Sequence, residues 1–590
     1  MRKTILIAGV FSSLLLASCS PTKSRVDLVL VHGRFDTLDG RLPVAEAVAV
    51  NKGVVVGVGS NSAVLAHFTA SVTIDLKGAY VLPGLIDGHA HMVALGVSLS
   101  TLDLIHAKSV KDVDELVQKA AKKFPAGSWI RGSGWSPAIW PGPDFHADKN
   151  LDSVAPGDYV FLVSSDGQAI WVNSKVLDLA GITNSTPEPK GGKIIRDKRG
   201  NPTGILVGSA INLVAEKMPP PGQHEIENAI MVAADTCARY GLTEVQDAGI
   251  SERTLRAYEN LDREHKLKIR VYAMYDGNDT TLPDILKKGP ISSRDGYFTM
   301  RSVRVDMDGT LHSRQAALVH SYSDDPASYG MTLMSGKSLE NLTIASLSSG
   351  FQVCTEAHGD RAVNVALNAY QRALKIAKVG DPRLRIEGAD VLLSRDIGKF
   401  EDLNVLPSMQ PARLTSDMFW IERLLGARRV SNYDVWKSLL DTGTIIIGGS
   451  DFPYESPDPR LGIYASVTRE DANGLPGSFA DARRYFSLSP DALADSSDFD
   501  RGFFPAQRMN MEEAIKAFTK WPAFGAFQEK EKGSISVWKD ADFTILASDL
   551  RKLPPRDVLS DHILATLVGG KLVYASPLWK NVSFETPENN

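Results

Sequence analysis

The chain has 590 residues, more than one hydrophobic core usually organises, so we expect a large domain with a smaller companion. Its formal net charge is −5, and lysine and arginine do not gather in any block. These properties are typical of a globular protein, and they exclude a nucleic-acid surface that is built on a basic patch.

The first 19 residues have the pattern of a secretion signal. Arg2 and Lys3 precede an apolar run, residues 5–17, that is too short to span a bilayer as a helix. The run ends in Leu-Ala-Ser-Cys, which resembles the lipobox of bacterial lipoproteins. We therefore expect residues 1–19 to hold a lipoprotein signal peptide, and Cys19 to anchor the mature chain to a membrane on the periplasmic or extracellular face of the cell envelope. The alternative is an ordinary cleaved signal with a chance cysteine.

Both ends of the mature chain are rich in short β-type segments. Four of them lie between residues 26 and 75, and two more follow at residues 541–546 and 564–574. Since these ends flank a long middle, we predict that they meet in one small β-sandwich. Its first part would span residues 20–82, and its second part, with the tail, residues 530–590.

The middle of the chain, residues 83–529, alternates between apolar β-type runs and helical patterns. With the strand that leads into His89 there are eight such runs, and this alternation predicts an α/β fold of the (β/α)8 TIM-barrel type. In such a barrel the chemistry lies at the C-terminal ends of the strands. The other seven runs are residues 242–246, 268–274, 301–307, 351–356, 383–387, 405–409 and 444–448.

Two segments interrupt the alternation. The longer, residues 93–240, follows the first strand and includes the stiff Pro-Pro-Pro-Gly connector at 219–222. An insertion at this end of a barrel usually covers the site, so we expect it to supply pocket walls. The shorter, residues 478–502, is aromatic and acidic, and we interpret it as a solvated loop, with a lid as the alternative.

The first barrel strand ends in His89-Ala90-His91. Residues two apart in an extended chain point to the same side, so both imidazoles can face one point. Imidazole is the commonest side-chain ligand of metals, and two of them supply half of a tetrahedral shell. The pair alone is equally consistent with a half-buried pair of histidines at a strand end.

Six motifs follow in order: Val-Leu-Pro-Gly-Leu-Ile-Asp-Gly-His-Ala-His (81–91), Ala-Ile-Trp-Val-Asn-Ser (169–174), Asp-Gly-Thr-Leu-His-Ser-Arg (308–314), His-Gly-Asp-Arg-Ala-Val (358–363), Ser-Met-Gln-Pro (408–411) and Gly-Ser-Asp-Phe-Pro (449–453). With them the chain resembles the amidohydrolase superfamily, in the branch that contains N-substituted formamide deformylase. The resemblance implies a metal-dependent hydrolase that cuts carbon–nitrogen bonds. His89 and His91 match the family's first-strand ligands, and Asp451 matches the eighth-strand aspartate that takes a proton from the catalytic water.

Three other ligand positions of the family are replaced in this chain. Arg304 stands where many members carboxylate a lysine, Glu356 at the fifth-strand histidine and Gly388 at the sixth-strand histidine. Arginine can neither be carboxylated nor bind a cation, and its charge repels a second metal ion. Glycine offers no ligand. We therefore expect one divalent metal ion, with zinc preferred, in place of two.

Two ligand sets remain open for this single ion. In the first, His89, His91 and Glu356 bind it as a known catalytic zinc shell, while Asp451 coordinates or acts as general base. In the second, Glu356 pairs with Arg304, and the two histidines and Asp451 remain. In either set Arg304 is a catalytic candidate, because it could stabilise developing negative charge.

Three more residues are candidate substrate contacts. Gln168 and Arg413 fall where the family has two further pocket histidines, and Arg413 would favour a carboxylate or another anion. His358 lies two residues beyond Glu356 on the same face, with core packing as its alternative. For the other two, the alternative is an exposed polar loop residue.

The leading hypothesis is a lipid-anchored amidohydrolase with one metal ion and a small-molecule substrate. Two rivals stay open: a catalytically inactive envelope binding protein on the same barrel, and a metal-independent lyase or isomerase. In the latter, Arg304, Glu356, His358 and Asp451 would perform acid–base chemistry. A homodimer is the default expectation for assembly.

Overall fold

The computed structural model describes residues 23–122, 126–136, 150–165, 167–218, 221–486, 499, 501–581 and 584–585. The predicted signal peptide and Cys19 lie outside these residues, as does most of the segment from 487 to 500. Within the described part of the chain, no helix is both long and apolar enough to cross a membrane.

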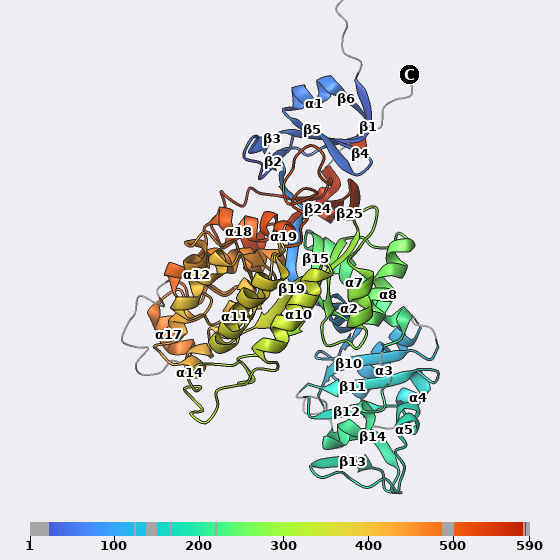
Figure 1. The fold of residues 1–590 in the computed structure, drawn as a ribbon. Helices are drawn as coiled ribbons and strands as arrows, with labels where there is room; N and C mark the ends of the chain where they lie inside the picture. Colours follow the sequence, from blue (N-terminus) through green and yellow to red (C-terminus); the bar gives the residue numbers. More distant parts are fainter. Residues whose placement is uncertain are drawn as a thin grey trace, which may run out of the picture.

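A parallel sheet of eight strands, hydrogen-bonded in chain order, forms the large domain, and all eight predicted strands are present. Helices connect the strands, among them α8 (Glu252–Arg263), α10 (Gly336–Ser348), α11 (Asp360–Ala377) and α12 (Ser394–Asp402). The predicted (β/α)8 barrel is thereby confirmed (Figure 1). The strands are β8 (Leu85–Ala90), β15 (Leu242–Ile250), β16 (Arg270–Asp276), β18 (Phe298–Asp306), β19 (Gln352–Ala357), β20 (Arg385–Gly388), β21 (Leu406–Met409) and β22 (Ile447–Gly448).

Backbone contacts between the first and last strands bring the ends of the sheet together. The amide of Asp451 donates to the carbonyl of His89 at 2.8 Å, and the amide of His91 donates to the carbonyl of Phe452 at 2.9 Å. The close approach requires a glycine at position 88, since a Cβ there would lie 2.2 Å from Cγ2 of Ile447. This closure places Asp451 beside both histidines.

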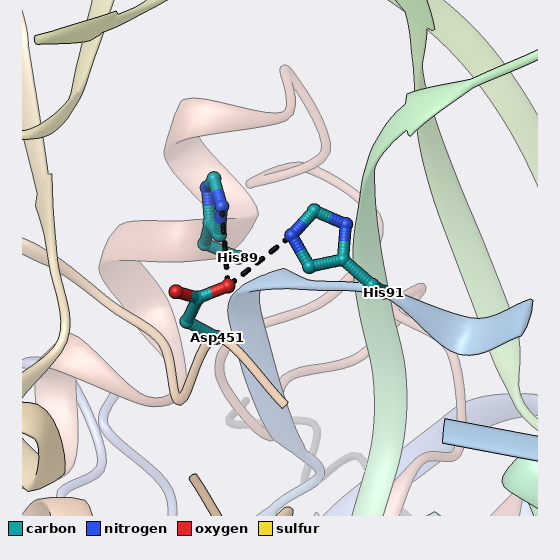
Figure 2. A group of neighbouring side chains, drawn as sticks. All are labelled: His89, His91 and Asp451. Atoms are coloured by element: carbon teal, nitrogen blue, oxygen red, sulfur yellow. Dashed lines mark ion pairs between the residues drawn. The ribbon is translucent and has the colours of Figure 1, made fainter. Parts of the chain in front are cut away.

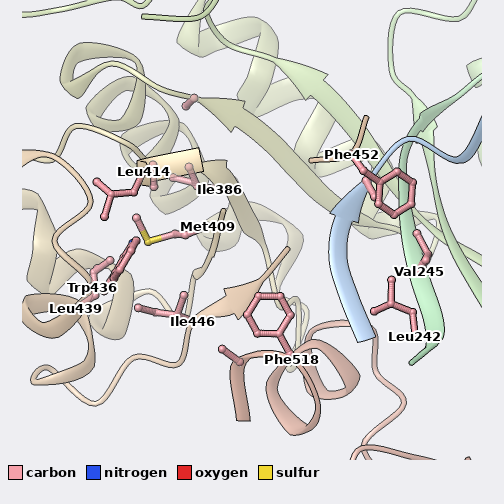
Figure 3. Packing of buried hydrophobic residues seen from close by; sticks show 14 of the residues in the cluster. Leu242, Val245, Ile386, Met409, Leu414, Trp436, Leu439, Ile446, Phe452 and Phe518 are labelled. Carbon is pink, nitrogen blue, oxygen red and sulfur yellow. The ribbon is translucent and has the colours of Figure 1, made fainter. Parts of the chain in front are cut away.

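One apolar cluster fills the space between the strands and the helices around them. Figure 3 shows Leu242 and Val245 of β15 on one side of it and Ile386 and Met409 on the other. Each of these four side chains is at most 1% exposed. Close packing of this kind holds the strand ends in fixed positions, which a precise site requires.

Both ends of the chain contribute to two further sheets, drawn at the top of Figure 1. A single apolar cluster contains Leu30 and Val48 from one sheet and Phe35, Val81 and Phe543 from the other. The first sheet has the order β26 (Phe584–Glu585), β6 (Phe68–Asp75), β1 (Ser24–Val31), β4 (Ala47–Asn51) and β5 (Val54–Gly59). The second has the order β25 (Lys571–Ala575), β24 (Ile563–Val568), β23 (Phe543–Leu546), β7 (Tyr80–Pro83), β2 (Arg34–Asp36) and β3 (Val44–Ala45).

The segment between the first two barrel strands forms a sheet of its own between residues 102 and 208. Its side chains pack into two separate apolar clusters. In contrast, α2 (Met92–Ser100) and α7 (Gln223–Arg239), at the two ends of the predicted insertion, bury side chains in the barrel cluster. The strands of this sheet are β9 (Leu102–Asp103), β10 (Trp129–Trp135), β11 (Tyr159–Ser164), β12 (Ala169–Val172), β14 (Pro202–Gly208) and β13 (Gly192–Arg196).

Candidate metal centre

His89, His91 and Asp451 meet at the C-terminal end of the barrel, where the first and eighth strands lie side by side (Figure 2). Oδ1 of Asp451 is 3.2 Å from Nε2 of His91 and 3.9 Å from Nε2 of His89. One ligand atom from each of the three residues lies within 4.8 Å of the others. The side chain of His91 is 31% exposed, whereas that of His89 is 3% exposed, so the group is accessible from one side.

The opposite nitrogen of each imidazole is already engaged. Nδ1 of His91 lies 2.9 Å from the carbonyl oxygen of Ala248. Because a carbonyl only accepts, this nitrogen must carry the proton, and Nε2 keeps its lone pair in the neutral ring. Nδ1 of His89 lies 2.8 Å from Oε2 of Glu387, a carboxylate that also accepts. Both rings therefore present Nε2 to the common point.

This geometry fits a metal ion. Ligand atoms about 2.0–2.1 Å from a tetrahedral zinc ion lie roughly 3.3 Å apart, and the two distances to Asp451 bracket that value. Three protein ligands with one open position form the usual shell of a catalytic zinc ion. A hydrogen-bonded carboxylate or carbonyl behind each ligating histidine is equally typical of such sites.

Arg413 holds the second oxygen of Asp451. Its Nη1 lies 3.3 Å from Oδ2, and its guanidinium also faces Asp417 and stacks over the ring of Tyr454. Asp451 itself adopts a left-handed backbone conformation, with φ of 58°, which is uncommon outside glycine. The expected anion contact of Arg413 is thus occupied by carboxylates of the protein.

Asp451 also affects the protonation of its neighbour. Burial alone would lower the pKa of His91, but the hydrogen bond and the negative charge of Asp451 raise that pKa above its usual value. A metal ion would compete with this proton for Nε2.

Glu356 takes the second of the two arrangements that the sequence left open. One of its oxygens forms an ion pair with Arg304, and the other lies 3.2 Å from Nε2 of His358. Arg304 also contacts Asp306 at 2.8 Å. Burial would raise the pKa of Glu356, but the charge of Arg304 and the hydrogen bond from His358 hold that pKa well below its usual value. Both carboxylate oxygens of Glu356 are therefore already satisfied.

His358 is a bridge between two carboxylates. Its Nδ1 lies 2.8 Å from Asp390 and its Nε2 faces Glu356, and the side chain is 2% exposed. Burial would lower its pKa, but the two carboxylates raise that pKa well above its usual value. Each ring nitrogen faces a carboxylate, which only accepts, so both nitrogens carry protons and the ring is a cation. A protonated imidazole has no lone pair for a metal ion.

Gly388 explains why this ring lies where it does. A Cβ at that position would be 2.8 Å from Nδ1 of His358 and 3.2 Å from Asp390, so the imidazole and its carboxylate occupy the space that a sixth-strand side chain would need. Two of the replacements, Arg304 and Glu356, belong to one chain of alternating charges, hereafter the charge chain: Asp306, Arg304, Glu356, His358 and Asp390.

The candidate Gln168 and the motif residue His312 lie outside this group. Gln168 is exposed in the turn between β11 and β12 of the inserted sheet, where its carbonyl accepts from the amide of Gly208. His312, in the loop after β18, packs its ring against Trp420 at a centroid distance of 5.2 Å. The hydrogen bonds and ion pairs given above for His89, His91 and Asp451 involve neither residue.

The sequence reasoning did not find three residues that support the site: Ala248, Glu387 and Asp390. Only Glu387 carried a signal, because it stands in the sixth-strand motif Arg-Ile-Glu-Gly beside the replaced ligand position. A backbone carbonyl such as that of Ala248 carries none.

The barrel, its first-strand histidine pair and its eighth-strand aspartate together define a hydrolase-type barrel of the amidohydrolase class. The sequence profile of the amidohydrolase family matches residues 72–574, and the chain belongs to this family. The predicted superfamily is confirmed.

Two curated relatives span nearly the whole chain. Protein LONG AFTER FAR-RED 3 of Arabidopsis thaliana is 30% identical over 96% of this chain and 95% of its own length. N-substituted formamide deformylase of Arthrobacter pascens is 25% identical over 93% of this chain and 98% of its own length. Among solved structures, a metal-dependent hydrolase of Pyrococcus furiosus shares the fold, with a TM-score of 0.69 and 24% identity over 89% of this chain and all of its own length.

Proposed function

We propose that the protein is a hydrolase that uses one divalent cation, zinc by preference, to cleave a carbon–nitrogen bond in an amide-like small molecule. The convergence of three ligand atoms from His89, His91 and Asp451 carries this proposal. A divalent cation in this position supplies Lewis-acid activation of a carbonyl group and of water. The relative from Arthrobacter pascens, whose name specifies N-substituted formamides, supports this bond class.

The residues of the chain have separate tasks in this reaction. His89 and His91 would hold the cation through Nε2, and Asp451 would hold it through Oδ1, the oxygen that faces both imidazoles. Asp451 takes a proton from the attacking water and delivers it to the departing nitrogen, which would otherwise leave as an unstable anion. Arg413 holds Oδ2 of Asp451 and so fixes the direction of the carboxylate.

The charge chain supports one cation in place of two. Arg304 and the protonated His358 place two positive charges where a second ion would need negative or neutral ligands. Since Asp306 and Glu356 already neutralise Arg304, we assign it no direct part in stabilising the reacting carbonyl.

We also propose that Cys19 anchors the protein to a membrane of the cell envelope, and that the substrate is met on its periplasmic or extracellular side. The apolar run at residues 5–17 and the Leu-Ala-Ser-Cys ending support this location. Symmetric pairing of two copies is the simplest expectation for assembly.

Turnover by protein that lacks residues 1–19 tests the proposed chemistry. Zinc-loaded protein should release amine from at least one member of a panel of N-substituted formamides and amides. Asp451→Asn should lower kcat at least 100-fold, because the amide cannot accept the proton of water. Asp325→Asn, in the loop after β18, is the control. Turnover that survives complete metal removal would favour the acid–base enzyme, and no turnover by zinc-loaded protein across the panel would favour the binding protein.

A further inference from the structure

A buried arginine, Arg385, contacts several barrel strands and is linked to the candidate metal centre through Glu387. The side chain of Arg385 is 0% exposed. Its Nη2 donates to the carbonyl of Gly88 at 2.7 Å and to Oγ of Ser408 at 3.0 Å, and its Nη1 donates to Oε1 of Gln246 at 2.6 Å. These partners belong to β8, β15 and β21, so one side chain on β20 joins four of the strands.

Glu387 lies between this arginine and the first metal ligand. Nε of Arg385 is 2.7 Å from Oε1 of Glu387, and Nη2 is 3.1 Å from Oε2. The same Oε2 lies 2.8 Å from Nδ1 of His89. The side chain of Glu387 is 0% exposed, so no water competes for these contacts. A guanidinium only donates, so it faces the carboxylate oxygens and leaves the carboxylate as an acceptor toward the imidazole.

We propose that Arg385 and Glu387 form a positioning pair that holds His89 in the Nδ1–H tautomer and aims its Nε2 at the metal position. This proposal rests on the proposed function only for the identity of the bound group. Glu387 touches neither substrate nor metal, and it acts through His89. The pair gives His89 the support that the carbonyl of Ala248 gives His91.

The Glu387→Gln substitution tests the pair because it replaces two accepting carboxylate oxygens by one accepting oxygen and one donating NH2 group. The amide oxygen should turn to Nε of Arg385, because the Nε contact at 2.7 Å is closer than the Nη2 contact at 3.1 Å and Nη2 keeps its acceptors on Gly88 and Ser408. The NH2 group is then left facing Nδ1 of His89. The imidazole must then accept at Nδ1 and carry its proton on Nε2, which removes the lone pair needed for the metal.

Two readouts follow, and neither requires catalysis. In metal-free wild-type protein at pH 8, labelled with 15N-histidine and assigned with His89→Gln, His89 should show the Nδ1–H tautomer, and Glu387→Gln should shift it to Nε2–H. Zinc affinity, measured by chelator competition, should fall 10- to 100-fold in Glu387→Gln, about the loss typical of a missing outer-shell partner. Zinc-loaded Glu387→Asp, which keeps the accepting carboxylate, should recover part of that affinity.

The matched control is Glu244→Gln. Glu244 is an equally buried glutamate of the same barrel, and it pairs with Lys532 away from the histidines. It should lose stability without changing the tautomer of His89 or the zinc affinity. Should Glu387→Gln fail to fold with Arg385 left unpaired, the double variant Arg385→Gln/Glu387→Gln removes both charges and allows the same measurements.

An Nε2–H tautomer of His89 in the wild-type protein would overturn the proposal. So would a zinc affinity of Glu387→Gln within twofold of that of Glu244→Gln. If wild-type protein binds no metal, the proposed function fails, but the tautomer measurement still decides whether the pair positions His89.

Discussion

The two halves of the barrel mouth differ in whether their charged groups are already paired with one another. At the ends of the first and eighth strands, Nε2 of His89, Nε2 of His91 and Oδ1 of Asp451 face one common point. On the fourth to sixth strands, the charge chain from Asp306 to Asp390 satisfies itself, with each cation placed between two carboxylates. One half is arranged to receive a cation, and the other already contains its own.

Under the proposed function, this difference accounts for one metal ion in place of two without loss of the fold. A buried carboxylate needs a positive partner, and a second metal ion and a guanidinium are alternative solutions to that requirement. In this chain Arg304 and His358 supply the positive charges, so the carboxylates at these strand ends are neutralised without a second metal ion. Single substitutions can disrupt one half at a time.

Loss of a histidine ligand should have the largest effect. His91→Ala removes one of three ligands and should weaken zinc binding at least 1,000-fold, as chelator competition can measure. His312→Ala is the control, because His312 packs on Trp420 in a nearby loop and should leave zinc affinity unchanged. Equal zinc affinity of the two variants would place the metal elsewhere.

Substitutions beside the charge chain should change the stability of the fold more than they change metal binding. Gly388→Ala puts a Cβ 2.8 Å from the His358 ring at a φ of 84°, so we expect it to destabilise the fold by about 2–5 kcal/mol in thermal or urea unfolding. Gly443→Ala has a similar φ of 97° but its nearest neighbour is 3.9 Å away, so only the backbone cost of about 1–2 kcal/mol should remain. Equal losses would show that His358 does not need the space.

The stability contributed by His358 should depend on pH with a defined sign. Its pKa is raised in the folded state, so its contribution is complete below its ordinary pKa of 6.5 and is lost as pH rises toward the folded value. The pKa values of Glu356 and Asp390 are lowered, so their contributions are complete above about pH 4.5 and are lost in acid.

The difference in unfolding free energy between wild type and His358→Gln should therefore be greatest near pH 5–6.5. Above that range it should decline by up to about 1.4 kcal/mol per pH unit. Urea unfolding between pH 4 and 9 measures it. A difference that stays constant from pH 6 to pH 9 would mean that His358 is neutral in the fold and that the charge chain is interrupted at this residue.

The sequence contained most of the fold and one half of the site. The eight strands could be predicted because each is an apolar run bounded by turn or helix signals, and the His89–His91 pair could be placed because strand periodicity is strict. Asp451 needed the family motif, since no local pattern links it to residues 360 positions away.

The charge chain could not be predicted, because its residues have more than one chemically suitable partner. Glu356 had two suitable positive partners, a metal ion or Arg304, and only side-chain geometry decides between them. The His358 ring lies where a side chain at position 388 would be, so its place depends on the missing side chain of Gly388. The contact of Glu387 with His89 joins residues that are 298 positions apart in the sequence. Sequence spacing carries no signal for either.

The number of metal ions per chain tests this account most directly. Protein without residues 1–19, produced in zinc-replete medium and freed of loosely bound metal, should contain one equivalent of zinc or another divalent ion by elemental analysis, and His91→Ala should contain none. Two equivalents in the wild-type protein would contradict the self-neutralised half of the barrel mouth, and none would contradict the half that His89, His91 and Asp451 form.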